Sequence, residues 1–375
     1  MINIEKLDPS SKKQVNEFVE FPFQVYKGVK EWVPPILADI KTMLNPNKHP
    51  FYEHSDVEFF VARQNGEMVG RIGLIENKPS NQYHDKKQAS FYLFESVDDQ
   101  SVADKLFDCA YEWTRKRKLN NLLGPKGLSS FDGYGFLVEG FDKRQMMTMM
   151  NYNQPNYPKF VENLGFKKVV DWVSCYTPIA EFKLPEKISE IARRVEERGS
   201  FKVVRFKNKG DLKKLAWQIG QTYNKSFVNN WEYYPLTDNE IKFVLDNILV
   251  VAVPELLKVI TYKDEVVGFL LAFPDISAAL QKYQGRLSPL ALYSYLRELK
   301  KTDWISFNGI GILPELHGRG GNALLMAEIE RTAHTFNFVH GELTQIAETA
   351  TEMRKDLQNL GVMPYKNHRI YGIDL

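Results

Sequence analysis

A glycine-rich segment in the last quarter of the chain has the residue types and spacing best suited to binding chemistry. The segment His317–Asn322 (HGRGGN) follows an apolar, alternating run at 304–313 and Pro314, and it precedes an amphipathic segment that starts at Ala323. Backbone N–H groups at a helix start, together with the helix dipole, attract anions. Glycines allow close approach and positive φ angles. With Arg319 as an added cation, the pattern predicts an anion site suited to a pyrophosphate.

Two common phosphate-binding motifs do not fit this segment. It lacks the Gly-Lys-Ser/Thr ending of a Walker A loop and the GxGxxG spacing of a dinucleotide-binding fold. The alternative interpretation is a tight turn in which the glycines serve the backbone alone.

The elements around this segment occur twice along the chain. Residues 59–75 and 258–273 each form an apolar run, a polar turn and a second run that contains Val-Gly, which is typical of a β-hairpin. Residues 159–169 and 355–365 each contain a helix end closed by Asn-Leu-Gly and followed by a strand. Both landmarks recur after about 200 residues, which indicates a duplicated domain.

Each half has the same coarse order of elements. A helical region comes first, followed by a hairpin, a third strand, a long helix, a further strand, a short helix and a closing strand, so we expect a mixed α/β fold with a central sheet. The expected domains are residues 1–182 and 183–375, with a linker around 178–187. The extra segments, 124–156 and 274–303, fall at different places in the two halves.

The second half resembles the GCN5-related N-acetyltransferase (GNAT) superfamily. The family motif, Gln/Arg-x-x-Gly-x-Gly/Ala, stands between a strand ending in Val-x-Pro and a long helix; Pro314 and Gly320 fit it, whereas His317 and Asn322 depart from it. The closing stretch 341–371 is also similar to the family's end. The family's Asn is replaced there by Thr349 and Ala350, and its Tyr by Leu357. The whole chain resembles two-domain bacterial GNAT-like proteins and, distantly, N-acyl amino acid synthases.

This resemblance implies an acyltransferase that uses acetyl-CoA or another acyl-CoA as co-substrate and a small-molecule amine as acceptor. It implies a tandem GNAT fold in which only the C-terminal copy binds the thioester. The residues it places against acyl-CoA are Ile310, Gly311, Ile312, Leu313, His317, Gly318, Arg319, Gly320, Gly321, Asn322 and Ala323. The backbone of Ile310 to Leu313 is expected to polarise the thioester carbonyl.

The first half has no counterpart of the glycine-rich segment. Its turn at 94–101 has no glycine and contains three carboxylates, Glu95, Asp98 and Asp99, which would repel a pyrophosphate. We therefore expect a degenerate copy without a CoA site, which acts as a scaffold and as one wall of the acceptor pocket.

Acyl transfer to an amine also needs a base to take the amine proton, and an acid for the leaving thiolate. The base candidates are Glu342 and Glu348, with His340 as a weaker one. The acid candidates are Tyr365 and Tyr371. The alternative is that the glutamates are solvated or salt-bridged and that the tyrosines are packing residues.

An aromatic segment at 229–237 comes before the second hairpin. Its residues Trp231, Tyr233 and Tyr234 are candidates for an acceptor pocket, and the alternative is that they belong to the core.

Composition limits the other partners. The chain has 375 residues, with 49 Lys+Arg against 47 Asp+Glu, and this net charge of +2 does not favour nucleic-acid binding. No apolar run is long enough to span a membrane. The two cysteines form no disulfide framework, which is typical of a reducing compartment, so we expect a cytoplasmic protein. His49 and His54 have no visible third ligand, and no metal site is expected.

Two further hypotheses stay open. The acyl donor could be acyl carrier protein, as in an N-acyl amino acid synthase. The chain could instead be a non-catalytic GNAT-fold protein that senses a ligand or binds a partner. The replaced Asn and Tyr favour this last hypothesis, and the HGRGGN segment favours an enzyme.

Overall fold

The computed structural model describes residues 1–146, 150–336 and 338–375. The chain folds into two compact units that are not contiguous in sequence. Unit 1 contains Met1–Val173, Ser277–Tyr295 and Tyr365–Leu375, and unit 2 contains Ser174–Ile276 and Leu296–Pro364. The domain boundary expected after residue 182 concerns the duplicated copies, and it stays a prediction.

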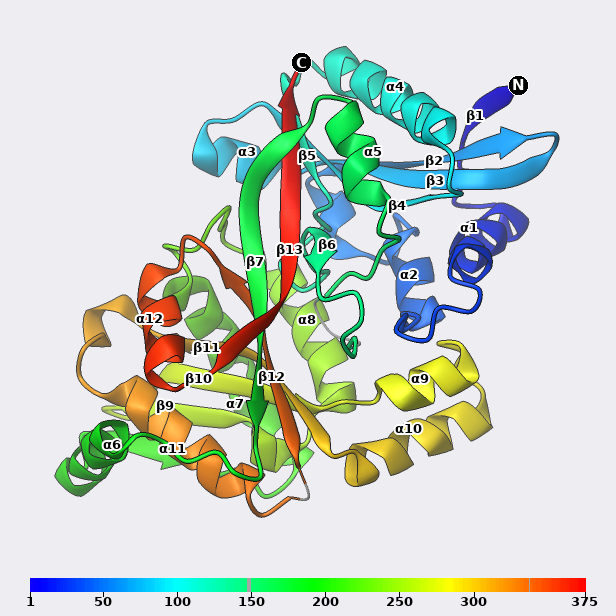
Figure 1. Ribbon diagram of the computed structural model, residues 1–375. Coiled ribbons are helices and arrows are strands. Elements are labelled where there is room, and N and C mark those ends of the chain that lie inside the picture. The colour runs from blue at the N-terminus through cyan, green and yellow to red at the C-terminus, as the bar shows by residue number, and fades with distance from the viewer. Residues whose placement is uncertain (147–149, 337) are drawn as a thin grey trace. The chain divides into compact units, whose positions relative to one another are not determined.

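The elements of unit 1 follow the predicted order (Figure 1). They are β1 (Ile2–Lys6), α1 (Lys12–Val25), α2 (Leu37–Met43), η1 (Pro50–Glu53), β2 (Asp56–Gln64), β3 (Glu67–Glu76), α3 (Lys78–His84), β4 (Gln88–Ser96), α4 (Gln100–Lys116), β5 (Asn121–Gly124), β6 (Phe136–Glu139), α5 (Tyr157–Asn163), the first part of β7 (Lys167–Pro178), α9 (Ser277–Tyr283), the start of α10 (Pro289–Lys301) and most of β13 (Met363–Asp374).

Unit 2 repeats this order. Its elements are the end of β7, α6 (Glu186–Arg198), β8 (Phe201–Val204), α7 (Lys209–Ser226), α8 (Asp238–Val251), η2 (Pro254–Leu256), β9 (Lys258–Tyr262), β10 (Glu265–Pro274), the end of α10, β11 (Trp304–Ile312), η3 (Pro314–Leu316), α11 (Gly321–Ala333), β12 (His340–Ala347) and α12 (Thr351–Asn359). The predicted hairpins, third strands and long helices are present in both units.

Each unit contains a mixed sheet with helices packed on both faces. The strand order is β1-β2-β3-β4-β5-β13-β7 in unit 1, where β6 also pairs with β13, and β7-β12-β11-β10-β9-β8 in unit 2. The pairs β4–β5 and β11–β12 are parallel, and the other pairs with a described register are antiparallel. The expected mixed α/β fold built from two similar copies is confirmed.

The closing strands do not stay with the copy that precedes them in sequence. In unit 1, β13 lies between β5 and β7, and Tyr371 pairs with Gly124. In unit 2, the C-terminal part of β7 lies beside β12. Figure 1 shows β13 in red beside the green β7. The last strand of the chain therefore completes the sheet of unit 1.

The two hairpins use the same turn with different residues. Asn65 and Gly66 connect β2 and β3, and Lys263 and Asp264 connect β9 and β10. All four residues have positive φ, which is the type I′ geometry that matches the twist of adjacent strands. Asn-Gly adopts it easily, whereas Lys-Asp adopts it at a conformational cost.

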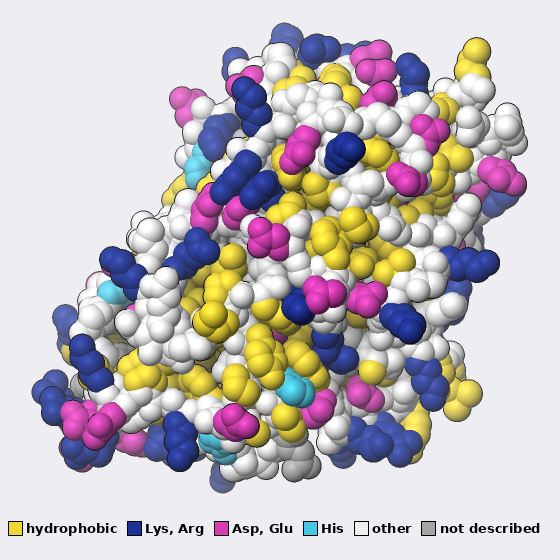
Figure 2. Space-filling model, viewed as in Figure 1, with side chains coloured by type: hydrophobic (Ala, Val, Ile, Leu, Met, Phe, Trp, Pro, Cys, Tyr) yellow, Lys and Arg dark blue, Asp and Glu magenta, His cyan; other side chains and the backbone are white. Residues whose placement is uncertain are grey.

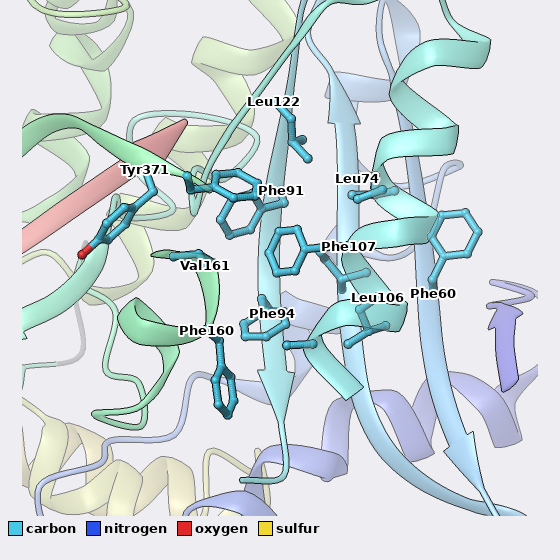
Figure 3. Packing of buried hydrophobic residues seen from close by; sticks show 14 of the residues in the cluster. Phe60, Leu74, Phe91, Phe94, Leu106, Phe107, Leu122, Phe160, Val161 and Tyr371 are labelled. Carbon is cyan, nitrogen blue, oxygen red and sulfur yellow. The ribbon is translucent and has the colours of Figure 1, made fainter. Parts of the chain in front are cut away.

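Buried aromatic residues fill the core between the sheet of unit 1 and its helices α4 and α5. Phe91 and Phe107 meet edge to face with ring centroids 5.1 Å apart, and Tyr371 from β13 belongs to the same cluster. Figure 3 shows these side chains on β4, α4 and β13. A second cluster, which includes Phe18 and Phe59, packs α1 and α2 against the other face. Unit 2 is built in the same way, with α6 and α11 on one face and α7 and α8 on the other.

Candidate functional site

The glycine-rich segment connects β11 to α11, as the sequence predicts. After η3, Gly318 and Gly320 both have positive φ (+73° and +85°), and Gly320 is the N-cap of α11. The ring Nε2 of His317 lies 2.9 Å from the carbonyl oxygen of Ile312, so the histidine ties the loop back to the end of β11. The N–H groups of the first helical turn have no acceptor within the helix and remain for capping or for a ligand.

The three glycines of this loop are required for different structural reasons. A Cβ on Gly320 would lie 2.6 Å from Cγ2 of Val195 on α6, and one on Gly321 would lie 2.8 Å from Cδ1 of Ile312. Packing within unit 2 therefore accounts for both. At Gly318 nothing lies within 4 Å of the added atom. Its glycine is explained by positive φ alone, and the loop surface there is open to a ligand.

The charges around the loop favour an anion. Arg319 and Asn322 are exposed, and the first turn of α11, all of whose residues are described, has no acidic side chain. The helix N-terminus adds about half a positive charge. Glu315 is exposed in the preceding turn and is the acidic residue of η3. The loop thus has the features expected of a phosphate site.

Strand β11, which leads to this loop, lies between β10 and β12. The described register of β11 with β12 covers Trp304 to Phe307, and it ends where Phe307 meets Leu343. β11 continues to Ile312 and stays paired with β10. Gly309 pairs with Leu271 and Phe307 pairs with the next residue, Ala272, so Asn308 forms a β-bulge. The Nδ2 atom of Asn308 lies 3.5 Å from Oγ1 of Thr344 on β12. The backbone groups of β11 beyond Phe307 that do not bond to β10 face the opposite side of the strand.

The alternation of an antiparallel ladder divides the four predicted backbone residues into two pairs. The N–H of Leu313 donates to Val267 of β10, at 2.9 Å. Gly311 has the same orientation as Leu313, whereas Ile310 and Ile312 direct their N–H and C=O groups to the other side. Among the residues predicted to polarise the thioester carbonyl, Leu313 therefore uses its N–H in the bond to β10. The N–H of Ile310 points to the other side of the strand, where it could bond to a ligand.

The C-terminal end of α7 lies against the same part of β11. A Cβ on Gly311 would be 3.0 Å from Cβ of Ser226, and one on Gly309 would be 3.9 Å from Cζ of Phe227. The predicted aromatic residues follow directly in the loop between α7 and α8. Tyr234 is buried, Trp231 and Tyr233 are half-buried, and the Tyr233 hydroxyl donates to the backbone oxygen of Asn224.

The base candidates occupy different positions on or beside β12. Glu342 is fully buried and pairs in register with Ser306 of β11. Glu348 is half-buried in the turn directly after β12. The ring Nδ1 of His340 lies 2.7 Å from the hydroxyl of Tyr176, and the ring packs against Trp304. The charge of Glu342 also acts on Cys175, whose thiol pKa is raised to about 11, chiefly by burial.

The two tyrosines proposed as acids fall in unit 1. Tyr365 is half-buried on β13. Tyr371 is buried in the core of unit 1, and its hydroxyl donates a 2.8 Å hydrogen bond to Glu162. Burial and this bond raise the pKa of Tyr371 above its usual range. The contacts of Tyr371 are therefore those of a packing residue, the alternative that the sequence left open.

The turn at 94–101 in unit 1 uses its three carboxylates structurally. Asp99 caps α4 by accepting from the backbone N–H of Ser101, and Asp98 accepts from the side chain of Asn156. Glu95 is buried and accepts hydrogen bonds from the hydroxyls of Tyr26 and Tyr157. Glu95 is on β4, and its side chain is enclosed within unit 1 rather than placed at the start of α4.

Some polar residues of this site were not predicted. Asn308 and Thr344 interrupt apolar strands, and that interruption is the sequence signal that could have identified them. No pattern along the chain indicated that Glu95 would meet two tyrosines from distant segments.

The described part of the chain contains neither a candidate metal centre nor a membrane-spanning helix. Within residues 1–146, 150–336 and 338–375 there is no group of three or more His, Cys, Asp or Glu side chains that could hold a metal ion. In the same residues no helix is both long and apolar enough to cross a membrane.

Known structures with the same architecture cover the whole chain. A tandem GNAT protein from the clavulanic acid biosynthesis pathway matches all of this chain and 98% of its own, with a TM-score of 0.57 and 12% identity. The chain has the tandem GNAT fold. A GCN5-related N-acetyltransferase from Sphaerobacter thermophilus also matches the full chain and 95% of its own, with a TM-score of 0.51 and 11% identity. The two copies deduced from the hairpins thus correspond to the two GNAT copies of a tandem fold.

Two curated proteins are similar in sequence over nearly the full length of this tandem GNAT-fold chain. Protein YghO of Escherichia coli is 23% identical over 96% of the chain and 93% of its own length. The bacterial ceramide synthase of Caulobacter vibrioides is 25% identical over 96% of the chain and 94% of its own length. No family model matches the chain.

Proposed function

We propose that the protein transfers an acyl group from acyl-CoA to the amine of a small-molecule acceptor, with the thioester bound by unit 2. The observation that supports this most is the loop at the start of α11. Gly318 has positive φ and an open surface there, next to exposed Arg319 and to the first-turn N–H groups of a 13-residue helix. This arrangement suits the pyrophosphate of CoA.

We place the acyl-pantetheine arm along β11 beyond Phe307, on the side away from β10. An extended amide chain can bond to the backbone groups of β11 that β10 does not use, which include those of Ile310. The Ile310 N–H would then stabilise the negative charge that develops on the thioester oxygen. Holding the amine beside this carbonyl supplies much of the rate enhancement.

The reaction needs one proton to leave the amine as the C–N bond forms and the C–S bond breaks. Glu342 and Glu348, which both belong to unit 2, remain the proposed bases for this step. Trp231, Tyr233 and Tyr234 remain the proposed wall of the acceptor site, which is supported by the position of their loop directly after the end of α7 against β11.

A longer acyl group is the second candidate within this function. Ceramide is an N-acyl amino alcohol, and the bacterial ceramide synthase matches this chain over nearly its full length. That similarity favours a long-chain donor and an amino-alcohol acceptor over acetyl transfer. Acyl carrier protein is the alternative donor.

The non-catalytic alternative also has an observation in its favour. Leu357, which stands near the position of the family's usual tyrosine, is buried in unit 2 and has no proton to give. A direct test of binding and turnover therefore decides between the two functions.

The test uses Asn322→Asp. An acidic residue in the first turn favours the helix, but it repels a pyrophosphate, so this change separates binding from folding. The full chain is titrated calorimetrically with acetyl-CoA and palmitoyl-CoA below its micellar concentration, and turnover is followed by thiol release with amines. We expect saturable binding by the wild type and at least a tenfold loss in the variant, and the preferred thioester identifies the acyl length.

The matched control is Asn208→Asp, which makes the same charge change at the N-cap of α7, where aspartate also caps well. It should bind acyl-CoA like the wild type. Absence of binding to either thioester would contradict the CoA proposal. Binding without thiol release across the amines would support the non-catalytic alternative.

The proposed setting is cytoplasmic, with a small-molecule acceptor and no nucleic-acid partner. Basic and acidic side chains are interspersed over the face of the molecule shown in Figure 2, in line with the near-neutral net charge. A surface of this kind does not favour a polyanion.

A further inference from the structure

A cavity lies in unit 2, away from the glycine-rich loop. It has a volume of about 380 Å³ and is lined by residues from the ends of β8 and α11, from η2 and from the start of β9. Its α11 residues begin at Glu328, about 10 Å along the helix from the loop at Gly321. The acyl-transfer proposal gives this cavity no role.

Lys258 is the buried cation of the cavity. Its side chain is 5% exposed, and its Nζ donates a 2.6 Å hydrogen bond to Oγ1 of Thr332. The Thr332 hydroxyl donates in turn to the backbone oxygen of Glu328. An ammonium group has three donors, and Thr332 Oγ1 is its acceptor among the residues that the structure describes. Burial lowers the pKa of Lys258, as expected for an ammonium that lacks full solvation.

Two arginines share one buried carboxylate at the same cavity. Arg205 and Arg331 donate to Oε1 of Glu328, at 2.7 and 2.5 Å. Glu328 is 3% exposed, whereas the side chains of both arginines are at least half exposed. With Lys258 there are three cations, against the carboxylates of Glu255 and Glu328, so the lining has one net positive charge.

The remaining walls are apolar. Phe206, Leu257 and Phe336 line the cavity beside the charged groups. A volume of this size is in the range of small-molecule sites, in which apolar walls hold the body of a ligand and a few polar groups fix its orientation. One excess positive charge is neutralised by a monoanion. A dianion would be left with uncompensated charge and would be repelled by the two carboxylates.

We propose that this cavity binds a small organic carboxylate with an apolar body. The carboxylate pairs with Lys258 at the buried end and with the free donors of Arg205, and the body of the ligand packs on Phe206 and Phe336. The site is distinct from the proposed CoA loop and does not depend on it.

Benzoate is a suitable probe, benzamide is its neutral isostere, and inorganic phosphate is the competing anion class. Binding to the full-length protein is measured by calorimetry and by ligand-observed NMR. We expect saturable benzoate binding, at least tenfold weaker binding of benzamide and phosphate, and at least a tenfold loss in Lys258→Met. Arg205→Gln should also weaken benzoate binding severalfold. This variant should fold, because the Arg205 side chain is exposed and Glu328 keeps its ion pair with Arg331. It therefore provides the test if Lys258→Met does not fold.

The matched control is Arg193→Gln, which removes an exposed arginine on α6 that pairs with Glu197. It should bind benzoate like the wild type. The proposal is overturned if benzoate does not bind saturably, if benzamide or phosphate binds as well, or if folded Lys258→Met or Arg205→Gln retains wild-type affinity. Because Asn322→Asp should leave benzoate binding unchanged, a failure of this site and a failure of the acyl-CoA site are distinguishable.

Discussion

The hydroxyl of Tyr26 donates a 2.7 Å hydrogen bond to the carboxyl group of Glu95 inside unit 1. Tyr157 donates a second bond to the same oxygen, at 3.0 Å, and a guanidinium nitrogen of Arg71 lies 3.7 Å from the other. Burial nevertheless dominates and raises the pKa of Glu95 to about 7 from its usual 4.5. The N-terminal copy therefore contains a titratable group at its centre.

This pKa predicts how Glu95 affects stability. Between pH 4.5 and 7 the folded chain keeps the Glu95 proton and the unfolded chain releases it, so this contribution falls as pH rises and is fully lost above pH 7. The difference in unfolding free energy between wild type and Glu95→Gln should change by about 3 kcal/mol across this window, in favour of the variant at high pH. Urea titrations at several pH values measure it.

The comparison with Glu95→Gln is needed because another group in unit 1 acts in the opposite direction. Burial lowers the pKa of His368 to about 3, so protonation of the unfolded chain below pH 6.5 destabilises the fold as pH falls. This contribution is present in both proteins and cancels in the difference. Parallel stability curves for wild type and Glu95→Gln would contradict the prediction.

The hairpin turn of unit 2 should be easy to stabilise. Lys263 and Asp264 both have positive φ, so the double change Lys263→Asn with Asp264→Gly removes strain without disturbing a buried contact. We expect an increase of about 1 kcal/mol in the stability of the hairpin β9–β10, measured by hydrogen exchange of its amides. The reverse change, Asn65→Lys with Gly66→Asp, should reduce the protection of β2–β3. Equal protection in all three proteins would show that turn strain is not limiting.

The sequence predicted the local elements well and the long-range pairings poorly. The local pattern of neighbouring residues determines the hairpins, the long helices and the helix ends at Gly165 and Gly361. Both glycines have the positive φ expected at the end of a helix. The position of β13 in unit 1 depends on pairing between Tyr371 and Gly124, which no local pattern specifies. Likewise the loop at Gly318 could be predicted from its composition, whereas the partners of Glu95 and Lys258 come from distant segments.

The position of β13 has a direct consequence for stability. Tyr371 is among the last residues of the chain, yet it packs in the core of unit 1 with Phe91 and Phe107. Tyr371→Ala should destabilise unit 1 by about 3–5 kcal/mol, as for other large aromatic-to-alanine changes in a core. Hydrogen exchange should show the loss in β4 and α4. Tyr371→Phe, which loses only the bond to Glu162, should cost about 1 kcal/mol. A loss confined to amides of unit 2 would contradict the assignment of β13.

Glu342 and Glu348 are the last pair to distinguish, because both are proposed bases for the same amine. Glu342 is fully buried opposite Ser306, whereas Glu348 is half-buried in a turn that follows β12. Replacing the true base by glutamine should lower kcat by about 10²–10⁴ and leave the Kd for acyl-CoA unchanged. The other glutamine variant serves as the control and should retain most of the rate. Raising the pH should partly rescue the inactive variant, because solvent then supplies the neutral amine that the missing base would have formed. Wild-type kcat in both variants would exclude both carboxylates, and a matching loss of acyl-CoA affinity would instead assign the affected residue to binding.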